Sequence, residues 1–248
     1  MTLLHSLLTR KLQCDYGKMM QTPPRHRLAI YDMDKTITHK ATFGPFISHV
    51  LKRYRPGRAV MLPAMAAVTA GYGLNLIDRT RLKEINLGLL LGNPIDRAEA
   101  AQIAESFAME TRRTNFLSEA LRRIAADRAA GYRIVLATAS YRFYVEAIAQ
   151  LLAIEDVIAT RCLAAGEEAF LPQIAGQNCY GEAKLMMVKE WLRSAGLKRE
   201  DCHIRFYSDH VSDAPCLAFA DEAFATNPHA PLRELSGKRG WPVLDWPE

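Results

Sequence analysis

A short apolar run that ends in two carboxylates constrains this chain more than any other feature. Leu28 to Tyr31 is long enough for a buried strand, and Asp32 and Asp34 follow it directly. Residues two apart in an extended segment point to the same side, so the two carboxylates would repel each other there. A bound divalent cation replaces that repulsion with shared attraction, and Thr36 adds a hydroxyl on the same side. The pattern therefore favours a metal-binding strand end over an acidic turn.

Apolar strands alternate with helices after Gly131, which indicates a parallel sheet covered by helices on both faces. Further strands are expected over residues 133–138, 156–160, 203–207 and 222–226, with helices over residues 141–152 and 182–195. Between Thr38 and residue 133 the sequence predicts only helices, over residues 43–54, 59–77, 82–91, 95–112 and 116–130. The expected fold class is α/β: a Rossmann-like core with a mainly parallel sheet, and a helical insertion after the first strand.

Polar residues stand at the C-terminal ends of three predicted strands, namely Asp32, Thr138 and Asp209. The ligand crevice of an open parallel sheet lies at this edge, so these residues would converge. Thr138 opens a Thr-Ala-Ser segment before a helix, where hydroxyl and amide groups suit a phosphate oxygen. Taken alone, this segment is better explained by Thr138 or Ser140 as a plain N-cap. Lys184 lies in the first turn of a helix, where a cation is mildly unfavourable, and Asp213 lies four residues after Asp209.

Taken in chain order, these motifs resemble the complete set of the haloacid dehalogenase-like (HAD) phosphatases. That set consists of D-x-D-x-T, a Thr or Ser after a strand, a Lys, and D-x-x-x-D. This chain supplies it at Asp32 to Thr36, Thr138, Lys184 and Asp209 to Asp213. The resemblance covers roughly residues 27 to 245. Lys35 stands where many members have Gly, a departure that leaves both carboxylates in place.

The resemblance implies a role for each position. Asp32 would be the nucleophile and a metal ligand, and Asp34 the general acid and base, with its backbone carbonyl on the metal. Asp209 would be the third metal ligand, and Asp213 would support the metal or the lysine. The phosphate would be held by Thr138, Ala139 and Lys184. The implied cofactor is Mg²⁺, which prefers hard oxygen ligands and needs only one or two carboxylates.

The motif order predicts three parts of the chain. Residues 1–26 are expected to be an N-terminal extension, because their Leu-rich patch is short and precedes the charges, the wrong order for a secretory signal. Residues 27–41 and 117–248 would form the HAD core domain. Residues 42–116 would form a helical cap domain that lies over the crevice.

Residues 59–77 carry no charged side chain. At ~1.5 Å per residue they could just cross a hydrocarbon core, but the site residues before and after them must meet on one side of any membrane. Two interpretations stay open: a buried cap helix, or a segment in the membrane interface. Basic residues that would suit anionic headgroups flank it, namely Lys52, Arg53, Arg55, Arg58, Arg79, Arg81 and Lys83.

The order of Thr42-Phe-Gly-Pro-Phe46, basic residues and an apolar segment is similar to HAD subfamily IB. It is most like the bacterial phosphatidylglycerophosphatase branch, whose substrate is a lipid phosphate. Phosphoserine phosphatases belong to the same subfamily, but they carry Ser-Gly-Gly where this chain has Thr138-Ala-Ser140.

The expected function is a Mg²⁺-dependent phosphomonoester hydrolase that acts through an aspartyl-phosphate on a lipid or amphiphilic phosphate such as phosphatidylglycerophosphate. One alternative is a phosphatase of a small soluble metabolite such as phosphoserine. A second alternative is a non-catalytic module that binds phosphorylated ligands.

Charge and cysteine content bound the partners and the compartment. The net charge of +5 suits anionic partners, but no long Lys/Arg run or nucleic-acid motif is present, so no nucleic-acid partner is expected. The five scattered cysteines form no C-x-x-C pair and fit a reducing compartment. We therefore expect a cytoplasmic protein, with peripheral contact on the inner face of the membrane through residues 59–77. His210 is expected on a loop surface.

Overall fold

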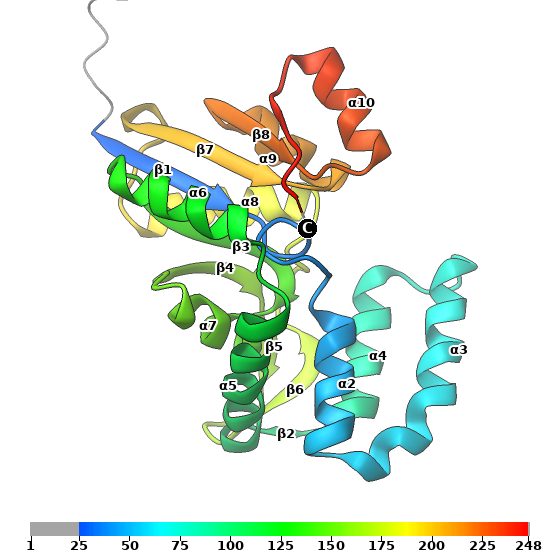
Figure 1. The fold of residues 1–248 in the computed structure, drawn as a ribbon. Coiled ribbons are helices and arrows are strands. Elements are labelled where there is room, and N and C mark those ends of the chain that lie inside the picture. The colour runs from blue at the N-terminus through cyan, green and yellow to red at the C-terminus, as the bar shows by residue number, and fades with distance from the viewer. Residues whose placement is uncertain (1–24, 248) are drawn as a thin grey trace, which may run out of the picture.

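A parallel six-stranded sheet forms the centre of the protein (Figure 1). The computed structural model describes residues 25–247, so the extension predicted over residues 1–26 lies almost wholly outside the described residues. In spatial order the strands are β4 (Asp156–Thr160), β3 (Arg133–Tyr141), β1 (His26–Tyr31), β7 (Cys202–Ser208), β8 (Glu222–Thr226) and β9 (Val243–Leu244). Every neighbouring pair is parallel. The expected α/β fold with a mainly parallel sheet is confirmed.

Strand β1 lies between β3 and β7 and is buried on both faces of the sheet, which explains its uninterrupted apolar run. Ala29 and Tyr31 point into the hydrophobic cluster on one face of the sheet, and Leu28 and Ile30 into the cluster on the other. The first cluster includes residues of α5 (Arg97–Thr114), α6 (Ser118–Ala129) and α7 (Arg142–Leu151). The second includes residues of α8 (Glu182–Ser194), α9 (Ala214–Phe219) and α10 (Ala230–Arg239). Helices therefore cover both faces, as predicted.

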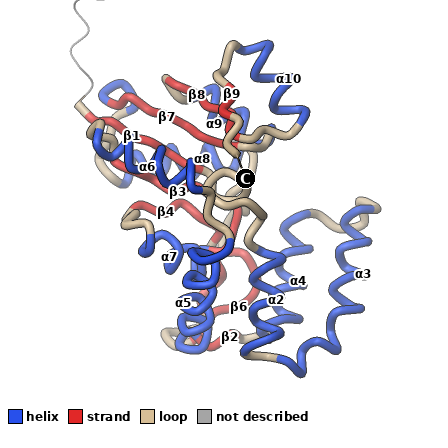
Figure 2. Tube along the Cα trace, viewed as in Figure 1, coloured by secondary structure: helices blue, strands red, loops and turns tan. Residues whose placement is uncertain are grey.

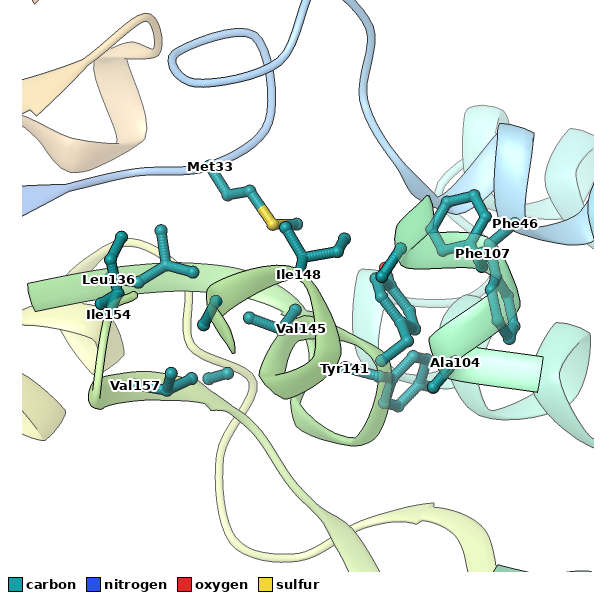
Figure 3. Packing of buried hydrophobic residues seen from close by; sticks show 14 of the residues in the cluster. Met33, Phe46, Ala104, Phe107, Leu136, Tyr141, Val145, Ile148, Ile154 and Val157 are labelled. Carbon is teal, nitrogen blue, oxygen red and sulfur yellow. The ribbon is translucent and has the colours of Figure 1, made fainter. Parts of the chain in front are cut away.

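The insertion, residues 42–116, separates β1 from β3. Its elements are α2 (Phe43–Arg53), the 3-10 helix η1 (Pro56–Met61), α3 (Leu62–Gly73), α4 (Arg79–Leu91), β2 (Ile95–Asp96) and α5. Asp78 and Asp96 cap α4 and α5 by accepting hydrogen bonds from the amides of Arg81 and Glu99. Figure 3 shows Phe46 of α2 and Phe107 of α5 near the end of β3 and helix α7, with 5.2 Å between the two ring centroids. The insertion and the sheet thus share one hydrophobic cluster.

A second, three-stranded sheet joins the insertion to the C-terminal half of the chain. Its order is β2, β6 (Ala169–Ile174) and β5 (Cys162–Ala164), and both pairs are antiparallel. The sequence analysis did not predict β5 or β6, and it placed Ile95 in a helix. That helix prediction is wrong for Ile95, which lies in β2 opposite Phe170 of β6. A two-residue strand exists only through this long-range pairing and leaves no periodic pattern in the sequence.

The uncharged segment 59–77 is not buried. It comprises the second half of η1, all of α3 and most of the connection to α4, and Met65 is its only buried residue. Val60, Leu62, Leu74 and Leu76 are between 45% and 75% exposed. Helix α3 lies at the outer edge of the insertion (Figure 2). It is apolar on all sides but packs on one side only, against α4 and η1. The expectation of a buried cap helix is therefore wrong.

No helix within residues 25–247 has both the length and the apolar character needed to cross a membrane.

Candidate active site

A cavity of about 230 Å³ brings the predicted site residues together. It lies at the C-terminal ends of β1, β3 and β7. The chain leaves this end of β1 and continues into α2 of the insertion (Figure 1). The lining of the cavity includes all seven predicted positions, namely Asp32, Asp34, Thr138, Ala139, Lys184, Asp209 and Asp213. Residues up to 181 positions apart in sequence thus converge as the parallel topology predicts.

The chain turns sharply after β1, and this turn presents the first two carboxylates. The amide of Asp32 still donates to the carbonyl of Tyr207, at 2.9 Å, and the amides of the next turn fold back on the carbonyl of Met33. Lys35 lies at this turn with φ 61°, a backbone conformation that favours glycine. This explains why the position tolerates Gly. Thr36, expected on the same side as the carboxylates, is instead fully buried and does not line the cavity.

Asp34 is held from two directions. Its Oδ1 accepts from the amide and the hydroxyl of Thr42, both at 2.8 Å, and its Oδ2 accepts from the hydroxyl of Ser140 at 2.9 Å. Thr42 lies just before α2 and Ser140 near the end of β3, so the insertion and the sheet both fix this carboxylate. From the sequence, Thr42 and Ser140 stood out only as parts of family patterns, so their contact with Asp34 was not predicted.

Lys184 lies between two buried carboxylates. Its Nζ is 2.8 Å from Oδ1 of Asp32 and 2.6 Å from Oδ2 of Asp213, which also accepts from the hydroxyl of Ser208. Burial disfavours the charge of Lys184, but Asp213 and Asp32 outweigh burial and raise its pKa well above the ordinary value. Burial raises the pKa of Asp32 well above its usual range. Lys184 offsets only part of this rise, and the neighbouring carboxylates raise the pKa further. The two ion pairs explain why this lysine occupies a helix N-terminus.

Asp209 is the fourth carboxylate of the site. Burial, with the charge of Asp213 added, raises the pKa of Asp209 to about 6. Oδ1 of Asp213 is buried and lacks a hydrogen-bond donor among the described residues. Four carboxylates thus line the cavity with three cationic residues, Lys35, Arg79 and Lys184, of which only Lys184 is buried, so carboxylate oxygen atoms remain for a metal ion.

These oxygen atoms fit Mg²⁺. Within residues 25–247, no group of three or more His, Cys, Asp or Glu side chains is arranged to hold a metal alone. The expected ligands are two carboxylates, those of Asp32 and Asp209, with the carbonyl of Asp34. Mg²⁺ is commonly bound by so few protein ligands, together with water and phosphate oxygens.

Six further residues of the lining were not predicted as site residues, namely Lys35, Ala41, Arg79, Tyr180, His210 and Ser212. Arg79, at the start of α4, places its guanidinium 4.2 Å from the centre of the Tyr180 ring. His210 was expected on a loop surface, but it also lines the cavity and stacks on His229 with 4.2 Å between ring centroids. Its Nδ1 accepts from the amide of Ser212, so in the neutral ring Nε2 carries the proton. His210 directly follows Asp209 in sequence, whereas no motif marked Arg79 or Tyr180.

Comparisons with known proteins agree with this geometry. The family model of the haloacid dehalogenase-like hydrolases matches residues 29–218. A probable phosphatase of Mycobacterium tuberculosis is 30% identical over 91% of this chain and 77% of its own length. A histidinol-phosphatase of Neisseria meningitidis is 21% identical over 88% of this chain and 98% of its own length. A solved structure from Bordetella pertussis, of unknown function, has TM-score 0.79 at 28% identity and covers 90% of this chain and 99% of that one.

Proposed function

This chain belongs to the haloacid dehalogenase-like hydrolases and is a phosphatase of that family, and on this premise we propose its reaction and substrate class. The reaction is Mg²⁺-dependent hydrolysis of a phosphomonoester through an aspartyl-phosphate. The substrate is a lipid or amphiphilic phosphate, such as phosphatidylglycerophosphate. The observation that carries the chemistry is the buried cluster in which Lys184 fixes Asp32 while Thr42 and Ser140 fix Asp34. The alternative of a non-catalytic module is set aside.

In the first step a carboxylate oxygen of Asp32 attacks phosphorus. Oδ1 of Asp32 accepts from Lys184, so we assign the attack to Oδ2. The bond from phosphorus to the leaving oxygen breaks, and Asp34 donates its proton to that oxygen. In the second step Asp34 takes a proton from water, the water oxygen bonds to phosphorus, and the acyl phosphate bond breaks. Because the hydroxyls of Thr42 and Ser140 can each donate or accept, they hold Asp34 in both protonation states.

The remaining side chains hold the phosphoryl group. Lys184, Thr138 and Ala139 line the cavity, and their ammonium, hydroxyl and amide groups would bind its oxygen atoms. Asp32, Asp209 and the carbonyl of Asp34 would hold Mg²⁺, with Asp213 in support. When bound, the ion supplies positive charge against the developing negative charge of the transferred group.

The exposed apolar surface supports the amphiphilic substrate. Leu74 and Leu76 are 70% and 75% exposed on the connection between α3 and α4. Leu76 lies three positions before Arg79, which lines the cavity, and a chain spans at most about 10 Å over three positions. A substrate could therefore place its phosphate beside Asp32 and its apolar part against this connection. Residues 42–116 would then act as the cap of a core formed by residues 27–41 and 117–248.

The same surface would give peripheral contact with the inner face of the membrane in the cytoplasm, through residues 59–77. The flanking cations divide into two groups. Lys52, Arg53 and Arg81 are exposed and can meet anionic headgroups. Arg53 and Arg81 also pair, with Glu110 and Glu84, and the half-buried Arg55 pairs with Glu99. Lys83 is buried, so its predicted headgroup contact is wrong.

A small soluble phosphomonoester is the second candidate substrate. The cavity of about 230 Å³ holds a phosphate and a small polar group but lies below the roughly 300–1,000 Å³ of sites that enclose a whole ligand. The histidinol-phosphatase relative acts, by its name, on such a compound.

Vesicles that contain phosphatidic acid separate the two candidates, with para-nitrophenyl phosphate as the soluble reference substrate. We expect Leu74→Ser combined with Leu76→Ser to lower vesicle binding and phosphatidic acid hydrolysis, because both side chains are exposed and lie beside the cavity. Turnover of the soluble substrate should stay nearly unchanged. Met109→Ser, at an exposed apolar position of α5, is the matched control.

Two results would contradict these proposals. A wild-type enzyme that ignores anionic vesicles yet releases phosphate from phosphoserine or histidinol phosphate would establish the soluble substrate class. A folded enzyme with Mg²⁺ that releases no phosphate from any of these substrates would reject the proposed reaction.

A further inference from the structure

We propose that Lys83, which lies outside all the motifs, is a positioning residue that ties helix α4 of the insertion to the phosphate-binding segment Thr138 to Ser140; this inference rests on the proposed reaction. Lys83 is only 9% exposed, although it lies on a helix of the insertion. Its Nζ is 2.6 Å from the carbonyl oxygen of Ala139, 2.7 Å from Oδ1 of Asn178 and 3.3 Å from Oγ1 of Thr160. These acceptors come from three separate segments of the chain.

The contact with Ala139 matters because the peptide group between Ala139 and Ser140 makes a second hydrogen bond through its N–H. The amide of Ser140 belongs to the peptide plane whose carbonyl Lys83 holds, and this amide donates to Oγ1 of Thr138 at 3.1 Å. Oγ1 of Thr138 therefore accepts from the protein and keeps its own proton for a phosphate oxygen. The hydroxyl of Ser140 donates to Asp34 at 2.9 Å. One peptide plane thus orients both a phosphate-binding hydroxyl and a partner of the acid and base.

The charge on Lys83 links this arrangement to pH. An ammonium has three N–H donors, which match the three acceptors, whereas a neutral amine has two. No carboxylate among the described residues accepts a hydrogen bond from Nζ, and the nearest aromatic ring is that of Tyr141, 4.5 Å from Nζ. Burial, with the charge of Arg79 added, lowers the pKa of Lys83 to about 7. Loss of the proton near neutral pH removes one of the three bonds.

The charged and titratable groups around Lys83 come from several elements. Arg79 lies one turn earlier on the same helix and disfavours the ammonium. Asp34 after β1 favours it more weakly than burial disfavours it. The thiols of Cys162 in β5 and Cys179 before α8 are neutral near pH 7, because burial raises the pKa of each to about 12. The balance leaves Lys83 as a buried amine whose full set of hydrogen bonds requires a proton.

Lys83→Met tests this role, because Met has a similar length and no donor. With para-nitrophenyl phosphate and Mg²⁺, we expect kcat to fall roughly 10- to 100-fold, the range expected when a catalytic group is displaced by about 1 Å. In the wild type, kcat should decline as pH rises through about 7 from the loss of this proton, and Lys83→Met should lack that step. Lys83→Gln, which restores two N–H donors without a charge, should recover part of kcat and also lack the step. Lys52→Met, at an exposed lysine of α2, is the matched control and should behave as the wild type.

A second measurement does not depend on activity. The ¹⁵N-labelled amide of Ser140 should shift in NMR spectra as pH passes about 7 in the wild type, and Lys83→Met should abolish this titration. The proposal is overturned if Lys83→Met keeps both the kcat and the pH profile of the wild type, or if the Ser140 amide titrates identically in both proteins. A wild type that shows the amide titration but no phosphatase activity would reject the proposed reaction and leave the positioning contact supported.

Discussion

A buried lysine without a carboxylate partner should leave a signature in the pH dependence of stability. Lys83 has an ordinary pKa of 10.5 in the unfolded chain and about 7 in the folded protein. Between these two values the unfolded chain binds more protons than the folded protein, so the free energy of unfolding rises with pH. Below about pH 6 both states carry the proton and this contribution is constant. The cost of burying the charge is therefore greatest at low pH and fades as pH rises above 7.

The size of the effect follows from the difference in pKa. Each pH unit above 7 changes the contribution by up to about 1.4 kcal/mol, which gives about 2 kcal/mol between pH 7 and 9. Lys83→Met removes this dependence of stability on pH. It also leaves one buried acceptor without a donor, because Thr160 has a single hydroxyl proton for two acceptors, the carbonyl of Ala139 and Oδ1 of Asn178. An unsatisfied buried acceptor costs about 1–3 kcal/mol at every pH. The free energy of unfolding of the variant, relative to that of the wild type, should therefore be highest at low pH and lowest at high pH.

Urea denaturation of the wild type and of Lys83→Met, at intervals between about pH 6 and 9, measures the difference directly. We expect the wild type to gain about 2 kcal/mol relative to the variant from pH 7 to 9, equivalent to a relative shift in melting temperature of roughly 4–8 °C for a chain of this size. Lys52→Met should follow the wild type at every pH. A difference between the wild type and Lys83→Met that is independent of pH would refute the reasoning, because it would mean that Lys83 keeps its proton in the folded protein throughout this range.

Three further predictions concern the site itself. Asp32→Asn should abolish turnover and the acid-stable, hydroxylamine-labile phosphoenzyme, and substantial turnover by the purified variant would reject Asp32 as the nucleophile. Mg²⁺ at about 100 times its Kd should stabilise the wild type by about 2.7 kcal/mol in thermal unfolding, and EDTA should reverse this stabilisation. Asp209→Asn should lose most of the stabilisation by Mg²⁺. Asp245→Asn, which removes a carboxylate from an exposed ion pair, should lose none of it. Gly181→Ala should cost about 1–3 kcal/mol and raise KM by displacing Lys184, because Gly181 has φ 59° and ψ −134°; an unchanged KM and melting temperature would contradict this.

Much of the core and the site could be predicted from the sequence because their signals are local. The apolar run Leu28 to Tyr31 is buried on both faces, and the strand predicted over residues 156–160 is strand β4. Parallel topology then places every strand end at one edge, so motifs read one at a time from the sequence had to meet. The seven predicted site residues accordingly line one cavity.

Tertiary structure alone decided what surrounds that cavity. The sequence of residues 59–77 is compatible with a buried segment and with an exposed one. Only the position of α3 at the outer edge of the insertion leaves Leu74 and Leu76 exposed to solvent. Lys83 and Arg81 are both cations of one helix, yet one is buried against Ala139 and the other is exposed. Burial and hydrogen-bond partners depend on which distant segments pack together, and sequence periodicity carries no record of that. The sequence therefore determined the chemistry of this site, and the packing of the insertion determined which further residues reach it.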